Sequence, residues 1–245
     1  MSHRPQIWTT SGVVEMPLNE IDAPSVKVAP LERKFNPYDF HGGTTIVIAG
    51  DDFAIVAGCT RMSSGYEIVS RNQTKLFEVT DRTVLASVGC LSDIDTLRRN
   101  LSAQAFEYEN NNNRVMSVSA AAQLLSVTLY YRRFFPYYAF NLLAGLDENG
   151  KGAVYGYDAV GSYQRDKYGA MGTGQTFIIP LLDNLVGHKN RCDPETPLTL
   201  DEAISIVKEV FVTATERDIY TGDSVEIKVI KKEGISTEIF QLKKD

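Results

Sequence analysis

Two uninterrupted apolar runs stand out in the early part of the chain, at residues 44–49 and 53–58. A short polar turn, Gly50-Asp51-Asp52, separates them, which predicts two antiparallel strands joined by a tight connection. Neither run alternates between apolar and polar residues, as a strand does when one of its faces meets water. We therefore predict that both strands are buried on both faces, inside a layered core.

The rest of the chain alternates between strand-like and helix-like segments. Further strands are predicted at residues 74–79, 83–88, 138–146, 152–157, 168–172, 224–230 and 235–242, and helices at 92–110, 117–134, 175–186 and 199–217. Capping boxes are predicted where Ser92 precedes Asp95 and where Thr199 precedes Glu202. This order predicts an α+β fold in which two antiparallel sheets pack face to face between two helix layers.

The first forty residues differ from the rest of the chain. Residues 1–40 contain five prolines and show no sustained hydrophobic period, so we predict an N-terminal tail followed by one domain at residues 41–245. The full chain of 245 residues is 43% hydrophobic and 23% charged, which is ordinary for a globular protein with a core of its own.

Composition also limits the kinds of partner and the cellular compartment that we expect. The net charge of −6 and the absence of a basic stripe argue against a nucleic-acid partner. No apolar run is long enough to cross a bilayer, and the first residues lack an apolar stretch, so no signal peptide is predicted. The three histidines have no metal-binding spacing, so no metal site is predicted. A sparse, odd set of cysteines indicates a reducing compartment without a disulfide framework: Cys59, Cys90 and Cys192.

A second pattern surrounds the first hairpin. A Gly43-Thr44 junction leads into it, Thr60-Arg61 leaves it, and Lys75 opens the next predicted strand. This arrangement resembles the β-type subunits of the proteasome, which are N-terminal-nucleophile hydrolases. In active members a propeptide is removed just before a threonine, which then attacks peptide carbonyls with its own freed α-amine as the base.

Active members of that family space their catalytic residues regularly. An aspartate, an arginine and a lysine follow the nucleophilic threonine by sixteen, eighteen and thirty-two residues. Counting back from Arg61 and from Lys75 leads to the same position, Gly43, which has no side chain. The aspartate position falls on Cys59, which has no carboxylate. The resemblance therefore implies a subunit with a degenerate site, which is not an enzyme by itself.

Three other positions follow the active pattern with small changes. Thr173 lies in Gly172-Thr173-Gly174, where active members have Gly-Ser-Gly. Asp218 and Thr221 match an Asp-x-x-Ser-Gly motif, with threonine in place of serine. In active members these residues support the catalytic threonine. In this chain we expect them to brace the loops that carry them.

Thr44 offers an alternative reading. Cleavage between Gly43 and Thr44 would expose a threonine amine, and the chain would then be an active threonine endopeptidase. However, Thr44 lies one residue further along the strand, which points its side chain to the opposite face. This register would also put Thr60 at the aspartate position and Leu76 at the lysine position.

The same resemblance implies that the N-terminal tail is a propeptide. Inactive β subunits do not cut their own propeptides at the usual place, and neighbouring active subunits shorten them to a stub. Phe35-Asn36-Pro37-Tyr38 is predicted to belong to such a retained stub.

The string at residues 132–138, Arg-Arg-Phe-Phe-Pro-Tyr-Tyr, begins within the last residues of the second predicted helix. Proline ends that helix, and arginine and aromatic side chains are the types that dominate protein contacts. We therefore predict an interface that comprises Arg132, Arg133, Phe134, Phe135, Tyr137 and Tyr138.

Within the family, this string is similar to a non-catalytic subunit at the sixth β position. The resemblance covers residues 34–245 and implies the four-layer α-β-β-α sandwich of N-terminal-nucleophile hydrolases. It also implies a structural subunit of the 20S proteasome, without cofactors, in the cytoplasm and nucleus. Its expected partners are other β subunits in a seven-membered ring, the α ring and the opposite β ring, while unfolded polypeptides pass through the chamber during ubiquitin-dependent degradation.

Overall fold

The computed structural model of the protein describes residues 6–9, 12–15, 37–189 and 197–244, and the chain divides into two units, Met1–Pro37 and Tyr38–Asp245. In the first unit, β1 (Gln6–Thr9) and β2 (Gly12–Glu15) pair as an antiparallel hairpin. This hairpin is not predicted from the sequence, because the prolines of the tail obscure two short runs of high strand propensity. Cys192, Phe35 and Asn36 lie outside the described residues.

The second unit contains two five-stranded antiparallel sheets. One has the strand order β12-β3-β4-β13-β14 and the other β11-β10-β9-β8-β7. The first sheet consists of β12 (Tyr168–Gly172), β3 (Thr44–Ala49), β4 (Ala54–Cys59), β13 (Ser224–Lys231) and β14 (Gly234–Gln241). The second consists of β11 (Tyr163–Asp166), β10 (Gly152–Tyr157), β9 (Ala139–Leu146), β8 (Thr83–Gly89) and β7 (Leu76–Thr80).

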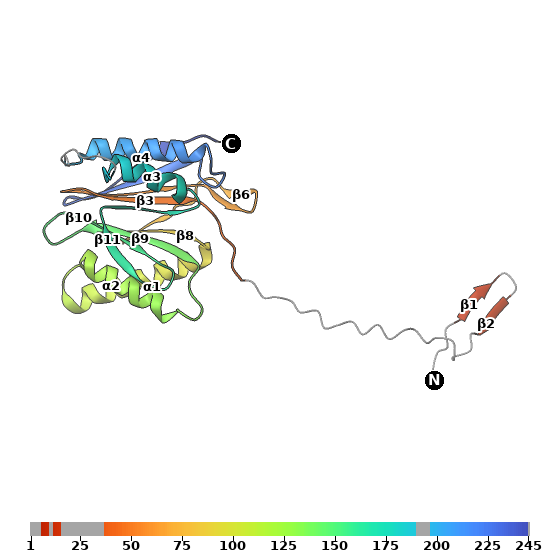
Figure 1. Ribbon diagram of the computed structural model, residues 1–245. Coiled ribbons are helices and arrows are strands. Elements are labelled where there is room, and N and C mark those ends of the chain that lie inside the picture. The colour runs from red at the N-terminus through yellow and green to blue at the C-terminus, as the bar shows by residue number, and fades with distance from the viewer. Residues whose placement is uncertain (1–5, 10–11, 16–36, 190–196, 245) are drawn as a thin grey trace. The chain divides into compact units, whose positions relative to one another are not determined.

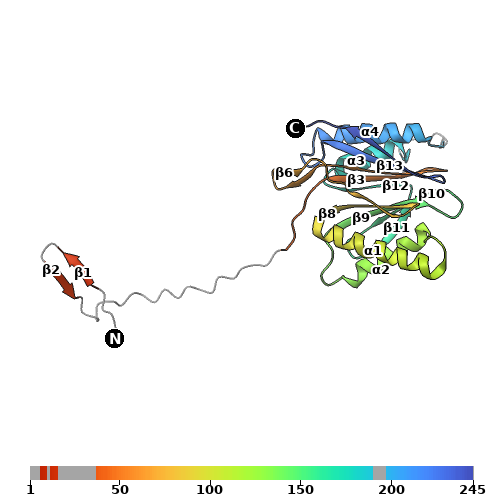
Figure 2. The ribbon, with the colours of Figure 1, turned by 180° about the vertical axis from the view of Figure 1, so that it is seen from behind.

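Helices cover the outer face of each sheet (Figures 1 and 2). The sheet that contains β3 is covered by α3 (Gln175–Leu185) and α4 (Leu200–Thr215). The sheet that contains β8 is covered by α1 (Leu91–Asn112) and α2 (Val118–Tyr131). The predicted α+β sandwich of two antiparallel sheets between helix layers is therefore confirmed.

Strand β3 contacts two different parts of the core. Ile46 and Ile48 pack into the apolar cluster under α3 and α4, whereas Val47 packs into the cluster between the two sheets. Because side chains alternate along a strand, an uninterrupted apolar run can fill both clusters at once. Strand β4 is buried along its whole length, as predicted.

The beginning of α1 differs from the prediction. The helix starts at Leu91, and its N-cap residue is Cys90, which makes no capping bond with its side chain. The amide of Leu91 is instead paired with His41, far away in the sequence. A tertiary contact has therefore replaced the local capping box predicted at Ser92 and Asp95. At the other end, the helix continues to Asn112 and ends at Asn113, whose φ of 51° is left-handed.

Two further strand pairings are absent from the prediction. No strand is predicted between residues 58 and 74, but β5 (Met62–Ser64) pairs with β6 (Glu67–Ser70). The edge strand β11 is exposed along its length and pairs only with β10. Without an apolar face, such a strand leaves no hydrophobic period in the sequence.

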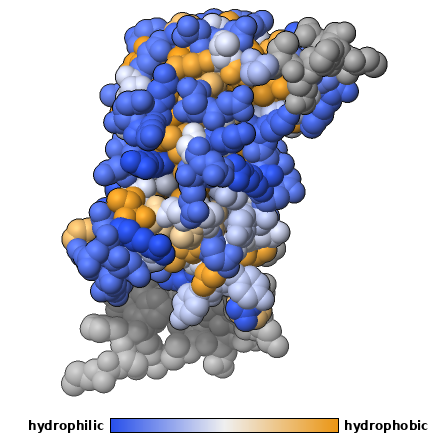
Figure 3. All heavy atoms as spheres, turned by 90° about the vertical axis from the view of Figure 1, so that its left-hand side faces the viewer, coloured by the Kyte–Doolittle hydropathy of each residue, from blue (hydrophilic) through white to orange (hydrophobic). Residues whose placement is uncertain are grey.

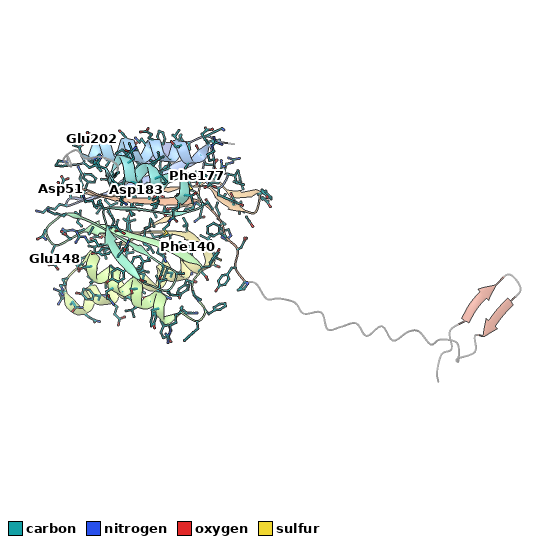
Figure 4. The ribbon with its side chains drawn as sticks, in the orientation of Figure 1. Asp51, Phe140, Glu148, Phe177, Asp183 and Glu202 are labelled. Carbon is teal, nitrogen blue, oxygen red and sulfur yellow. The ribbon has the colours of Figure 1, made fainter. Side chains whose placement is uncertain are left out.

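The two ends of the sandwich differ in character. Figure 4 shows Asp51 and Glu148, in the turns after β3 and β9, at the end opposite Phe140 and Phe177. Seen face-on in Figure 3, the end with Asp51 is mainly hydrophilic. Strand β3 begins at the other end, where the chain enters the second unit (Figure 1). Within the described part of the chain, no helix has the length and apolar character needed to cross a membrane.

The predicted capping box at the start of α4 is present, because Thr199 and Glu202 each bond the other's backbone amide. We predict that Thr199→Ala lowers the free energy of unfolding by about 1 kcal/mol, because an alanine cannot accept this bond. Urea denaturation should show the loss. The matched control is Thr213→Ala on the same helix, which should change the free energy by about 0.5 kcal/mol or less; equal losses in both variants would contradict the cap.

Candidate functional site

Gly43 lies directly before β3, at the position that the spacing of Arg61 and Lys75 assigns to the nucleophile of active proteasome β subunits. Its φ of 87° is in the left-handed region, which glycine adopts without strain. A Cβ atom at this position would lie 2.9 Å from Lys75 Nζ and 3.1 Å from Cys59 Sγ. The structure thus brings Gly43, Cys59 and Lys75 together, and the lysine side chain fills the space that a nucleophile would occupy.

Lys75 is held by backbone oxygens. Its Nζ donates hydrogen bonds to the carbonyl oxygens of Cys59 at 2.8 Å and Arg61 at 2.6 Å. The side chain is almost completely buried, and this burial lowers the pKa of the ammonium group, although the neighbouring Cys59 opposes the shift. No carboxylate within the described residues forms an ion pair with Lys75. The site therefore has a lysine but no side-chain nucleophile at Gly43 and no carboxylate at Cys59.

Thr44 is turned away from this lysine. Its Oγ1 accepts a hydrogen bond from the Gly174 amide at 2.8 Å and lies 2.8 Å from Thr221 Oγ1. Its amide donates to Cys59 Sγ at 3.3 Å, and the whole residue is buried. The hydroxyl is therefore enclosed by structural partners on the opposite side of the strand from Lys75.

A buried carboxylate organises the loops around Thr44. Asp218 Oδ2 accepts hydrogen bonds of 2.6 Å from the hydroxyl groups of Thr173 and Thr221. Its Oδ1 accepts a further bond from the Tyr220 amide at 3.1 Å. The three predicted positions Thr173, Asp218 and Thr221 therefore form one connected cluster. Thr221 bonds the hydroxyl of Thr44, and the amide of Thr173 donates to the carbonyl oxygen of Gly43 at 3.1 Å, so the cluster holds both residues in place.

Asp223 is central to the site but was missed in the sequence analysis. Arg61 Nε donates to Asp223 Oδ2 at 2.7 Å, and Arg71 pairs with Oδ1. Burial alone would raise the pKa of Asp223, but the hydrogen bonds from the two arginines outweigh it and hold the pKa below its usual range. Arg61 also donates to the carbonyl oxygen of Ile219 at 3.0 Å. No sequence motif indicates a role for Asp223, because its partners are distant in sequence. In the sequence analysis, Arg61 was used only to locate the position of Gly43.

The predicted interface is exposed only in part. Arg132, Arg133, Phe134 and Phe135 are exposed, and we call these four residues the aromatic–basic patch. The guanidinium of Arg133 lies over the rings of Tyr130 and Phe134, at 4.7 and 4.4 Å. Tyr137 is wrongly included in the prediction: its ring is buried in the core under α1 and α2.

Tyr138, the last residue of the predicted interface, is half-buried and packs against Tyr38, Phe40 and Phe140.

Possible metal-binding groups were searched for as well. Within the described residues, no group of three or more His, Cys, Asp or Glu side chains could hold a metal ion.

The position of Lys75 predicts the effect of a side chain at Gly43. We expect Gly43→Ala to lower the free energy of unfolding by roughly 2–4 kcal/mol, because it adds both left-handed strain and a clash with a pinned lysine. Gly65→Ala is the matched control, since Gly65 also has a positive φ of 56° but has open space around it. Denaturation should show a smaller loss there, and equal losses would mean that Lys75 moves aside easily.

The pair between Arg61 and Asp223 predicts a pH-dependent effect. Asp223→Asn should lower the free energy of unfolding by about 3–5 kcal/mol at pH 7, because it leaves Arg61 buried without its counter-charge. The folded pKa of Asp223 is depressed, so its contribution is fully present above about pH 4, its ordinary unfolded pKa, and is lost as the pH falls through the lower folded value.

Urea denaturation of Asp223→Asn and the unchanged protein, at several pH values, would measure this difference. Asp183→Asn is the control, because Lys189, the partner of Asp183, is exposed, so this pair should contribute much less to stability than the buried pair of Arg61 and Asp223. A difference for Asp223→Asn that stays constant from pH 7 to below its folded pKa would contradict the assignment.

Comparison with known proteins supports the resemblance to proteasome subunits. The family model described as proteasome subunit matches residues 39–230. The chain is 51% identical to proteasome subunit beta type-1 of Arabidopsis thaliana over 216 residues, which are 86% of this chain and 97% of the relative. It is 50% identical to the subunit of the same name from Danio rerio, over 88% of this chain and 92% of the relative.

A more distant relative has a different name. The chain is 41% identical to proteasome subunit beta type-6 of Saccharomyces cerevisiae, over 88% of this chain and 94% of the relative. The two-sheet sandwich, the spacing of Arg61 and Lys75, and these matches over most of the chain lead to one conclusion. The chain belongs to the proteasome subunit family.

Proposed function

We propose that this chain is a non-catalytic, structural subunit of the β ring of the 20S proteasome. As a family member it is a component of a threonine-protease complex and assembles with other proteasome subunits. In the proposed role it occupies one place in a seven-membered ring, supports assembly and helps to enclose the proteolytic chamber. Cleavage of unfolded polypeptides is then carried out by its neighbours.

One observation carries the proposal. The position of the nucleophile is Gly43, and the side chain of Lys75 lies in the space where a nucleophilic group would be. A threonine peptidase needs a hydroxyl, a base that takes its proton and a group that stabilises the charges. Among the described residues that would touch a side chain at Gly43, the lysine is present, but a nucleophilic hydroxyl and a carboxylate are not. The ammonium group of the lysine bonds two backbone carbonyls instead of a reacting side chain.

The alternative is an active threonine endopeptidase that uses Thr44. It is less well supported, because the Thr44 hydroxyl is buried and already bonded to Gly174 and Thr221. A peptide carbonyl could approach only if these contacts broke. Even a free amine at Thr44 would lie beside a thiol, at Cys59, instead of a carboxylate.

The proposed partners are neighbouring β subunits, the α ring and the opposite β ring, in the cytoplasm and nucleus. The aromatic–basic patch supports a contact role, because Phe134 is 87% exposed and Arg133 stacks on it. Exposed aromatic and arginine side chains of this kind are the types that carry most of the binding energy in protein interfaces.

The proposal predicts where the chain begins in the purified native complex. We expect it to start upstream of Thr44, so that the Thr44 nitrogen remains part of a peptide bond. Intact mass and N-terminal sequencing would measure this start. A threonine-directed electrophile should modify active subunits of the same complex, which serve as the control, and leave this chain unchanged. A start at Thr44 with labelling of this chain would overturn the proposal.

A further inference from the structure

The exposed side of α2 changes in character along the helix. Near its start, the exposed residues Ser119 and Gln123 are polar. On the same side, one and two turns later, Val127, Tyr130 and Tyr131 are also exposed, and Tyr131 is 83% exposed. We call these last three residues the apolar face of α2. The helix therefore becomes apolar toward solvent only where it approaches the aromatic–basic patch.

The aromatic–basic patch continues from the end of this helix in an ordered turn. The amide of Arg133 donates to the carbonyl oxygen of Tyr130 at 3.0 Å, and the amide of Phe135 donates to that of Arg132 at 2.9 Å. Single exposed apolar residues are common on protein surfaces, but several together indicate a contact site. The patch and the apolar face of α2 form such a group.

Arg133 connects the two parts of this surface. Its guanidinium lies over both rings, 4.7 Å from the centre of Tyr130 and 4.4 Å from that of Phe134. Arg132 lies over the ring of Tyr137 in the same way, at 5.3 Å. A planar guanidinium can stack on a ring and still present its N–H edge to an acceptor. Both arginines are thus held in position before any partner binds.

The charge of these arginines is not balanced within the described part of the chain. No carboxylate there forms an ion pair with Arg132 or Arg133. The Nη1 atom of Arg133 reaches the carbonyl oxygen of Tyr130 only at 3.5 Å, which is long for a hydrogen bond. In the sequence, no Asp or Glu occurs between Glu109 and Asp147, although the whole chain has a net charge of −6. A locally basic surface on an acidic protein favours an acidic partner.

A role at the helix end is an alternative explanation for the two arginines. Cations near the C-terminus of a helix offset the negative end of its dipole. This role accounts for the charge of Arg132 and Arg133, but it does not account for the exposed rings around them. A solvated helix end needs no apolar surface. The combination of stacked arginines with exposed Tyr131 and Phe134 is typical of a binding surface.

We propose that the aromatic–basic patch and the apolar face of α2 form one docking surface for an acidic segment of a neighbouring proteasome subunit. A carboxylate of that segment accepts hydrogen bonds from the N–H edge of Arg133, in the bidentate geometry that arginine favours. An apolar side chain next to this carboxylate packs between Tyr131 and Phe134. This assignment rests on the structural role proposed above, because its partner is another subunit of the same complex.

Photo-cross-linking in the purified native complex identifies the partner segment. A photoreactive benzoylphenylalanine in place of Phe134 should attach to another subunit, at a peptide with an aspartate or glutamate within about four residues, roughly one helical turn. The control carries the same analogue in place of Phe106, which is exposed on α1, and should not attach to this peptide. Attachment to a peptide without an acidic residue, or no attachment to another subunit, would overturn the proposal.

Charge reversal tests the contribution of the arginines. When it is expressed together with the unchanged chain, Arg132→Glu/Arg133→Glu should enter the complex at least about tenfold less often, because like charges then face each other. Arg82→Glu, in the exposed turn between β7 and β8, is the control and should enter as often as the unchanged chain. Equal incorporation of the double variant and the unchanged chain would contradict the docking surface.

A compensating change separates docking from a folding defect. Replacing the acidic residue of the cross-linked peptide by arginine should restore incorporation of Arg132→Glu/Arg133→Glu, because opposite charges then meet again. A variant that merely folds poorly gains nothing from a change in its neighbour. Incorporation that stays low with the compensating change would overturn the proposal.

The docking surface and the non-catalytic role can fail separately. A chain that starts at Thr44 and reacts with the electrophile would contradict the non-catalytic role, whatever lies opposite Arg133. A chain that starts upstream of Thr44 but enters the complex equally well with Arg132→Glu/Arg133→Glu would contradict the docking surface alone.

Discussion

The burial of β3 on both faces is the constraint on which the rest of the second unit depends. One face of this strand fills the cluster under α3 and α4, and the other fills the space between the sheets. A shift of one residue along the neighbouring strands would exchange the two faces and leave both clusters badly packed. The packing of the whole core therefore fixes the register of β3. This register also fixes the face to which each residue just before β3 points.

This register explains why Gly43 and the hydroxyl of Thr44 face different side chains. Adjacent residues point to opposite faces, so Gly43 faces Lys75 while the Thr44 hydroxyl faces Thr221. Lys75, Asp218, Thr173 and Thr221 all lie around these two positions. Gly43 itself has no side chain, and Cys59 has no carboxylate.

Much of the fold was predictable from the sequence, because apolar runs and capping residues report local structure directly. The spacing of Arg61 and Lys75 leads to Gly43 by two independent counts, and the structure places Gly43 beside Lys75 and Cys59. The remaining features depend on long-range contacts. Asp223, the pairing of His41 with Leu91 and the burial of Tyr137 each join segments that no local pattern connects. Edge strand β11 escaped notice because it has no buried face.

The strand order of the first sheet has a consequence for synthesis of the protein on the ribosome. Strand β4 pairs on one side with β3, its neighbour in sequence, and on the other with β13, which is made more than a hundred and fifty residues later. Until β12, α3 and α4 are made, the apolar β3–β4 hairpin has no partner on either edge and no helix layer above it, and the edge of β4 stays unpaired until β13 follows. Such surfaces aggregate readily. The nascent chain should therefore need protection by a chaperone until its last strands leave the ribosome.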